Sequence, residues 1–106
     1  MAESARFLRV LIAPKEKEPS VWIAHCLETG NVASAHSYAA VREMILDVLR
    51  EEILYARKFN NIKAVFRSPI PQDLIDRWNE ITRDNPPEEV ALFADGGPEV
   101  EMARAA

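Results

Sequence analysis

The chain has 106 residues, of which 48% are hydrophobic and 28% charged, and it contains one cysteine. This length fits one domain with a core of its own, and one cysteine excludes an internal disulfide and a cysteine-rich zinc site. No apolar run approaches the roughly 20 residues of a membrane span, and the N-terminal residues lack the apolar region of a signal peptide. We therefore expect a cytoplasmic protein that is neither secreted nor bound to a membrane.

The net charge of −4 is distributed unevenly. Residues 1–83 carry 12 basic and 11 acidic side chains, whereas residues 84–106 carry six acidic side chains against Arg104 alone. The sequence therefore predicts a single domain over residues 1–83, followed by a flexible acidic tail over residues 84–106. Such a tail argues against non-specific binding to nucleic acid, and it could instead dock on a basic partner.

Three strands are expected in the first third of the chain. Residues 6–13 and 21–27 are rich in apolar residues and flank a polar stretch with two prolines, which predicts an antiparallel hairpin. Gly30-Asn31 suits a two-residue type II′ turn, so that residues 32–36 would form a third strand paired with the second. With this turn, His25 and His36 become cross-strand neighbours.

A long amphipathic helix is predicted over residues 38–58, with Ser37 as its N-cap. Its apolar positions recur at helical spacing: Tyr38, Val41, Ile45, Val48, Leu49, Ile53 and Ala56.

Two further elements are predicted after this helix. In residues 62–67, the apolar side chains of Ile62, Ala64 and Phe66 alternate with Lys63, Val65 and Arg67, which indicates a fourth strand. A second helix over residues 72–82 begins after Pro71 and ends before Pro86-Pro87. It places four apolar residues on one side: Leu74, Ile75, Trp78 and Ile81. Residues 89–94 could add a short edge strand.

The predicted order, β-β-β-α-β-α, describes an α+β domain with an antiparallel sheet and one long helix packed on it. That helix can cover only one face of the sheet, yet the first two strands are apolar on both faces. The second helix with Trp78 is the simplest cover for the other face, and a second copy of the chain or a different protein is the next. We expect a homo-oligomer.

Residues 7–53 resemble the N-terminal domain of HicB-like antitoxins. The resemblance rests on the strand FLRVLIA, on WIAHCLETG, and on NVASAHS, which opens the helix SYAAVREMILDVLREEI. In that family the second strand commonly runs Val-Ala-x-Cys-Leu-Glu, and residues 23–28 read Ile-Ala-His-Cys-Leu-Glu. The capping Ser37 and the Leu49-x-x-Glu52 ending of the helix match as well.

This resemblance implies a partial RNase H-like fold, β-β-β-α-β, that binds a partner and has no nuclease activity. Members of the family typically neutralise a small basic HicA-like toxin, which cleaves RNA, and they associate as dimers or tetramers.

Catalysis by the chain alone is not expected. Metal-dependent RNase H chemistry needs carboxylates that converge on two cations, typically with one in the first strand, and residues 6–13 contain none. Glu43, Asp47 and Glu51 fall on one helix face, but they alternate with arginines, which is typical of a solvated face.

His25 and His36 could together ligate a metal or sense pH, so a metal-dependent hydrolase is the enzyme alternative. A third ligand is missing, because Cys26 should point to the opposite face as a buried structural thiol. We therefore predict no metal, no cofactor and no catalytic residue. Residues 62–81 resemble the start of a ribbon-helix-helix DNA reader, but the segment that follows is rich in proline and glycine, so DNA binding is not expected.

The leading hypothesis is a non-catalytic module that binds and neutralises a small basic toxin. Its candidate contact residues are Trp78, Glu88 and Glu89, although Trp78 could instead fill the core. An orphan, self-associating structural domain is the other alternative.

Overall fold

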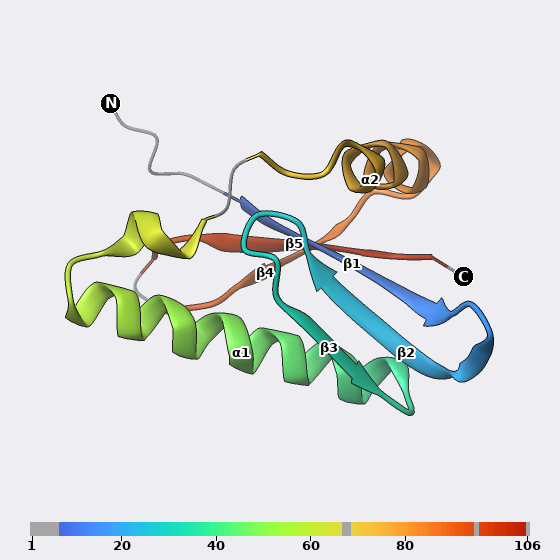
Figure 1. The fold of residues 1–106 in the computed structure, drawn as a ribbon, viewed down its shortest axis with the longest axis horizontal. Coiled ribbons are helices and arrows are strands. Elements are labelled where there is room, and N and C mark those ends of the chain that lie inside the picture. The colour runs from blue at the N-terminus through green and yellow to red at the C-terminus, as the bar shows by residue number, and fades with distance from the viewer. Residues whose placement is uncertain (1–6, 67–68, 95, 106) are drawn as a thin grey trace.

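The computed structural model describes residues 7–66, 69–94 and 96–105, which form a mixed five-stranded sheet with a helix on each face (Figure 1). The strand order is β3-β2-β1-β5-β4. The strands are β1 (Phe7–Lys15), β2 (Glu18–Cys26), β3 (Val32–Ala35), β4 (Glu88–Ala91) and β5 (Glu99–Arg104). The predicted α+β class is confirmed. The sheet is not purely antiparallel, however, because β1 and β5 run parallel.

The predicted hairpin of the first two strands is confirmed. Its register runs from Val10 opposite Cys26 to Pro14 opposite Trp22. The polar stretch expected as a loop mostly continues the two strands, and Lys15 still pairs with Glu18 after a local shift of register. The strands extend this far because an antiparallel pair needs only a two-residue connection.

The turn between β2 and β3 differs from the type II′ turn predicted at Gly30-Asn31. The Gly30 N–H donates to the Cys26 carbonyl and the Cys26 N–H to the Asn31 carbonyl, each at 2.9 Å, so residues 27–30 make the turn. Gly30 closes it with a φ of 83°, a left-handed value that glycine adopts readily. Leu27 is fully buried, which holds the start of this turn against the core.

The helix α1 (Tyr38–Lys58) has the predicted bounds. The Ser37 Oγ accepts a hydrogen bond from the Ala40 N–H at 3.0 Å, which confirms the N-cap. Its buried residues pack on one face of the sheet: Val41, Ile45, Leu46, Leu49, Ile53 and Ala56.

One core position of α1 was predicted wrongly. Val48 is 38% exposed, whereas Leu46, which falls outside the predicted apolar stripe, is 3% exposed. Leu46 lies one turn from both Arg42 and Arg50, whose guanidinium groups bond to Glu88 and to the Leu92 carbonyl. The buried face of the helix is therefore turned toward β4, which the sequence analysis placed in a tail.

Residues 62–67 do not form the predicted fourth strand. Ile62–Val65 is a short 3₁₀ helix, η1, that packs beside α1 with Val65 in the core, and Arg67 lies outside the described residues. The edge of β1 that faces away from β2 is occupied by β5, which pairs with β1 from Phe7 through Ile12.

The acidic tail predicted over residues 84–106 is also wrong. These residues supply β4, which confirms the possible edge strand, and β5, which lies inside the sheet between β1 and β4. In β5, Val100 and Met102 are buried against α1, whereas Glu99 and Glu101 alternate with them on the other face. A strand with one acidic face carries as much negative charge as a solvated tail does. The charge of this segment therefore did not distinguish the two.

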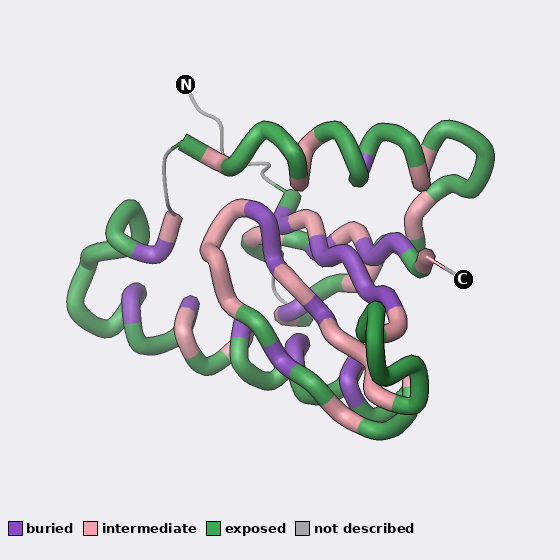
Figure 2. The backbone as a smooth tube through the Cα atoms, turned by 45° about the vertical axis from the view of Figure 1, so that its right-hand side comes forward, coloured by how far each residue is buried: buried purple, intermediate pink, exposed green. Residues whose placement is uncertain are grey.

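The helix α2 (Gln72–Asp84) covers the second face of the sheet, as predicted for the second helix. Trp78 packs there with Leu11, Leu27 and Ala103 in a core separate from the α1 core. Figure 2 shows buried positions along the central strands and exposed positions on the outer sides of both helices. In the described part of the chain, neither helix is long and apolar enough to cross a bilayer.

Candidate functional site

A row of charged side chains crosses the α2 side of the sheet at the level of Arg9. In the sheet register Arg9 lies opposite Glu101, and Glu101 lies opposite Glu89. Glu28, just after β2, extends the row on the other side of Arg9. We call Glu28, Arg9, Glu101 and Glu89 the charged row. It contains three carboxylates and one guanidinium group, and Arg9 neighbours Glu28 and Glu101.

Glu28 is bound tightly at one end of this row. One carboxylate oxygen accepts the Arg9 Nε–H at 2.6 Å, and the other accepts the Arg9 backbone N–H, also at 2.6 Å. The side chain thus satisfies a β1 backbone donor at the point where β2 has ended. Because the Glu28 carboxylate pairs with the Arg9 guanidinium, most of the negative charge of Glu89 and Glu101 at the other end of the row is not neutralised.

The carboxyl group of Glu101 has a raised pKa. Burial is the largest cause, repulsion from Glu89 and Glu28 adds to it, and attraction to Arg9 opposes it. Like charges directly opposite one another on neighbouring strands destabilise a sheet. The Glu89–Glu101 pair is therefore an unfavourable contact that a further cation would relieve.

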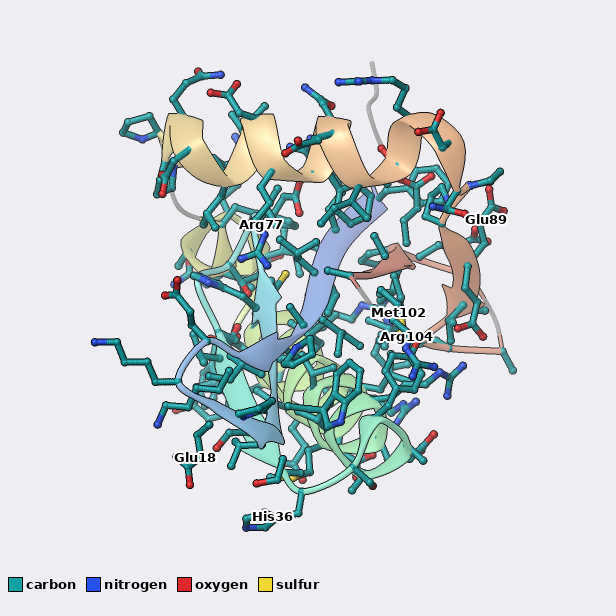
Figure 3. All side chains as sticks on the ribbon, turned by 90° about the vertical axis from the view of Figure 1, so that its right-hand side faces the viewer. Glu18, His36, Arg77, Glu89, Met102 and Arg104 are labelled. Carbon is teal, nitrogen blue, oxygen red and sulfur yellow. The ribbon has the colours of Figure 1, made fainter. Side chains whose placement is uncertain are left out.

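The pair is open to such a cation. Glu89 is exposed and lies on β4, the edge strand of the described sheet. Figure 3 shows Glu89 at the margin of the molecule beside β4. A lysine or arginine of another protein could approach both carboxylates from that side.

The two predicted contact residues Glu88 and Glu89 lie on opposite faces of β4. Glu88 faces α1, where its carboxylate accepts hydrogen bonds from Arg42 at 2.7 and 3.3 Å. The hydrogen bond to Glu88 raises the pKa of Arg42. Glu88 is therefore already paired within the chain, and only Glu89 joins the charged row.

The third predicted contact residue, Trp78, is 5% exposed. Its ring fills the core beneath α2, which corresponds to the alternative that the sequence left open for it. The indole is not on the surface, where a partner could contact it.

Three residues of the motif that carries the HicB resemblance hold the fold together. Cys26 is fully buried on the α1 side, and burial raises the pKa of its thiol. Leu27 is fully buried on the α2 side, and Glu28 binds Arg9. The side chains of this Cys-Leu-Glu segment thus anchor the end of β2 to both cores and to β1.

The structure does not bring the two histidines together. His25 lies opposite Val32, so the four-residue turn places His36 beyond the paired part of β3. His36 projects from the surface in Figure 3. Among the described residues, no three histidine, cysteine or acidic side chains are grouped so that they could hold a metal ion. The geometry assumed for a histidine-based hydrolase is therefore wrong.

The carboxylates on the outer face of α1 are solvated, as predicted. Glu43 pairs with Arg42 and Asp47 with Arg50, each at 2.9 Å, and both acidic side chains are exposed. They do not converge on a common point.

Three members of the charged row were not among the residues predicted from the sequence: Arg9, Glu28 and Glu101. The alternation of acidic and apolar residues in Glu99–Arg104 was the available signal for β5. No local pattern gives the parallel pairing that sets Glu101 beside Arg9.

Compared with protein-family models, curated proteins and solved structures, the chain has no match.

Proposed function

We propose that this chain is a non-catalytic protein-binding module whose ligand is a small basic protein, as its resemblance to HicB-like antitoxins implies. The observation that supports this proposal is the Glu89–Glu101 pair, two carboxylates held opposite each other on the edge strand β4 and its neighbour β5. A basic side chain of the partner would bind between them and remove their repulsion.

The charged row suits fast recognition of a basic surface. Three carboxylates against one arginine attract a cationic partner over distances of about a Debye length, roughly 8 Å at physiological salt. Such complementary charge speeds encounter and disfavours acidic proteins. If the partner is an RNA-cleaving toxin, covering its basic surface would also exclude its RNA. The chain would then act by masking, without any bond-making step.

The test begins with identification of the partner. The chain is used to capture proteins from a lysate of its native host at low and high salt, and a small basic protein released by salt is purified. Its affinity is then measured by calorimetry for the unaltered chain, for E89Q/E101Q, and for the control E51Q/E80Q. The control removes the same charge from two exposed helix positions outside the row.

We expect E89Q/E101Q to weaken binding by about tenfold or more, which corresponds to about 1.4 kcal/mol. The control should bind as the unaltered chain does, and only the unaltered chain and the control should rescue cells from the toxic partner. Equal affinity of all three chains, or equal loss in both variants, would contradict the proposal, as would capture of the chain alone.

A self-associating structural domain is the second candidate, and a different observation favours it. Met44, Val48 and Tyr55 of α1 and the C-cap residue Phe59 are 38–68% exposed, and their spacing places them along one side of the helix. The rings of Tyr55 and Phe59 contact each other at a tilt of 54°, with centroids 4.8 Å apart. We call these four residues the α1 stripe. An apolar stripe of this kind is typical of a helix that packs against another subunit.

The mass of the purified chain in solution tests this candidate. If the α1 stripe is a subunit interface, light scattering will give a multiple of the chain mass, and Tyr55→Lys will reduce it to that of one chain. The control is Glu80→Lys, an exposed position on α2, on the other side of the sheet from the α1 stripe. A monomer at all concentrations would remove this candidate.

A further inference from the structure

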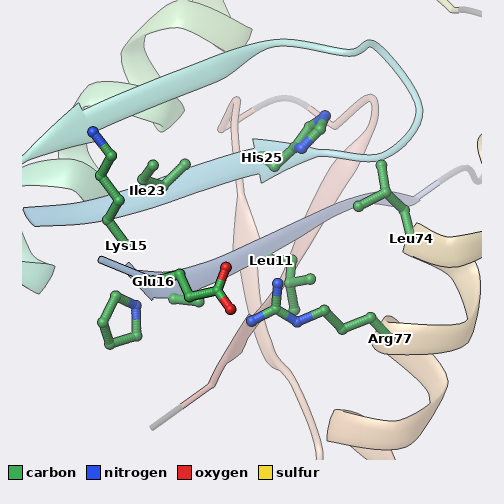
Figure 4. Close-up of a pocket in the computed structure, with 9 residues that line it drawn as sticks. Leu11, Lys15, Glu16, Ile23, His25, Leu74 and Arg77 are labelled. Atoms are coloured by element: carbon green, nitrogen blue, oxygen red, sulfur yellow. The ribbon is translucent and has the colours of Figure 1, made fainter. Parts of the chain in front are cut away.

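A concave site lies on the α2 side of the sheet, toward the other end of β1 from the charged row. It is a cleft of about 420 Å³ between the β1–β2 hairpin and α2 (Figure 4). This volume falls within the usual range of small-ligand sites, roughly 300–1,000 Å³. Nine residues line it: Leu11, Ala13, Pro14, Lys15, Glu16, Ile23, His25, Leu74 and Arg77.

The lining combines an apolar floor with charged groups of both signs. Leu11, Ala13 and Ile23 come from the facing positions of β1 and β2, where Ala13 lies opposite Ile23. In Figure 4, Glu16 reaches in from the hairpin, and Arg77 reaches in from α2 over the strands. The site therefore offers aliphatic contact, one carboxylate and one guanidinium group to the same small ligand.

The charged groups of the cleft differ in how they are engaged. Lys15 forms an ion pair with Glu18 at 3.3 Å. Most described arginines bind a carboxylate or carbonyl oxygen or lie over an aromatic ring. Arg77, like Arg83, makes no such contact within the described structure, and it does not pair with Glu16. Arg77 is exposed, and what distinguishes it from Arg83 is its position in the cleft beside the apolar floor, where its guanidinium group can bind an anionic ligand group.

We propose that this cleft binds a free aliphatic α-amino acid such as leucine. The planar guanidinium group of Arg77 matches a carboxylate through two parallel hydrogen bonds. Glu16 carries the charge that complements an α-ammonium group, and the side chain of the ligand would cover Ile23, which is only part-buried. A bound zwitterion would thus bridge two opposite charges that do not meet each other.

Binding is measured by calorimetry on the full chain with three probes. L-leucine carries both charged groups, 4-methylpentanoate lacks the ammonium group, and 3-methylbutylamine lacks the carboxylate. We expect saturable binding of leucine, with each analogue weaker by about tenfold or more. No heat from leucine at millimolar concentrations, or equal binding of all three probes, would overturn the proposal.

Two single variants separate the roles of the charged groups. Arg77→Gln should weaken leucine binding by about tenfold or more, whereas Arg83→Gln, on the same helix but outside the cleft, should leave it unchanged. Glu16→Gln should abolish the preference for leucine over 4-methylpentanoate while 4-methylpentanoate still binds. Equal effects of the two arginine variants, or an unchanged preference in Glu16→Gln, would contradict the assigned contacts. Circular dichroism confirms that each variant is folded.

Discussion

At the residue scale, the arrangement of carboxylates around Arg9 decides how the surface behaves. Glu28 binds the Nε–H and the backbone N–H of Arg9, so its charge is matched within the fold. Glu101 is part-buried beside Glu89, which raises the pKa of the Glu101 carboxyl. Two glutamates of one short row therefore have opposite effects, since the first stabilises β1 and the second weakens the sheet.

Glu101→Gln should stabilise the protein at neutral pH. The folded protein holds the Glu101 proton more tightly than the unfolded chain does, so its stability falls as pH rises from the ordinary glutamate pKa through the raised value. The variant lacks this loss, and we expect a gain of about 0.5 kcal/mol at pH 7 that disappears at pH below the ordinary glutamate pKa. Urea unfolding at several pH values measures it.

The control for this prediction is Glu99→Gln, which removes the same charge from an exposed position on the same face of β5. A gain that persists in acid, or that is equal in the control, would show that the raised pKa of Glu101 is not its source.

At the element scale, α1 has the predicted bounds, but its buried face differs from the predicted one. Its bounds and its Ser37 cap follow from local sequence, but its buried face is set by the strands that it covers. Because Arg42 and Arg50 both reach the β4 side of the sheet, Leu46 between them is turned into the core. Val48 is left at the margin, within the α1 stripe.

The two positions should respond differently to truncation. Leu46→Ala should lower the free energy of unfolding by about 2–4 kcal/mol, because it leaves a cavity at a site that is 3% exposed. Val48→Ala should change it by about 0.5 kcal/mol or less if the chain is a monomer. Chemical denaturation of both variants checks the pair. Equal losses would contradict the orientation of α1.

At the scale of the whole molecule, the C-terminal residues complete the sheet. β5 pairs with β1 on one side and with β4 on the other, and it contributes to both cores through Met102 and Ala103. Arg104 at its end lies 4.3 Å from the ring centre of Tyr38 and 4.9 Å from that of Trp22. The domain therefore needs residues from both ends of the described chain.

Removal of residues 84–106 should abolish cooperative unfolding rather than trim a tail. The deletion would expose the edge of β1 and remove the buried residues of β5, which a chain of this size cannot spare. The control E89Q/E99Q reduces the acidic charge of this segment and keeps its strands, so it should retain a cooperative transition. A truncated chain with a normal thermal transition would contradict the position of β5.

The sequence by itself determined the elements whose signals are local. The hairpin, α1 with its Ser37 cap, α2 and the short edge strand all follow from periodicity, capping and turn residues within a few positions of one another. Of the charged row, the sequence identified only Glu89.

Only the tertiary structure decided which strands are neighbours, and with them the site. The parallel pairing of β1 with β5 joins residues about 90 positions apart, and it sets Glu101 beside Arg9 and Glu89. Residues 62–67 were expected to supply the fourth strand, whereas β4 and β5 complete the sheet and Ile62–Val65 packs as η1 beside α1. A strand with one acidic face has the same charge as a tail, and only its partners in the sheet distinguish the two.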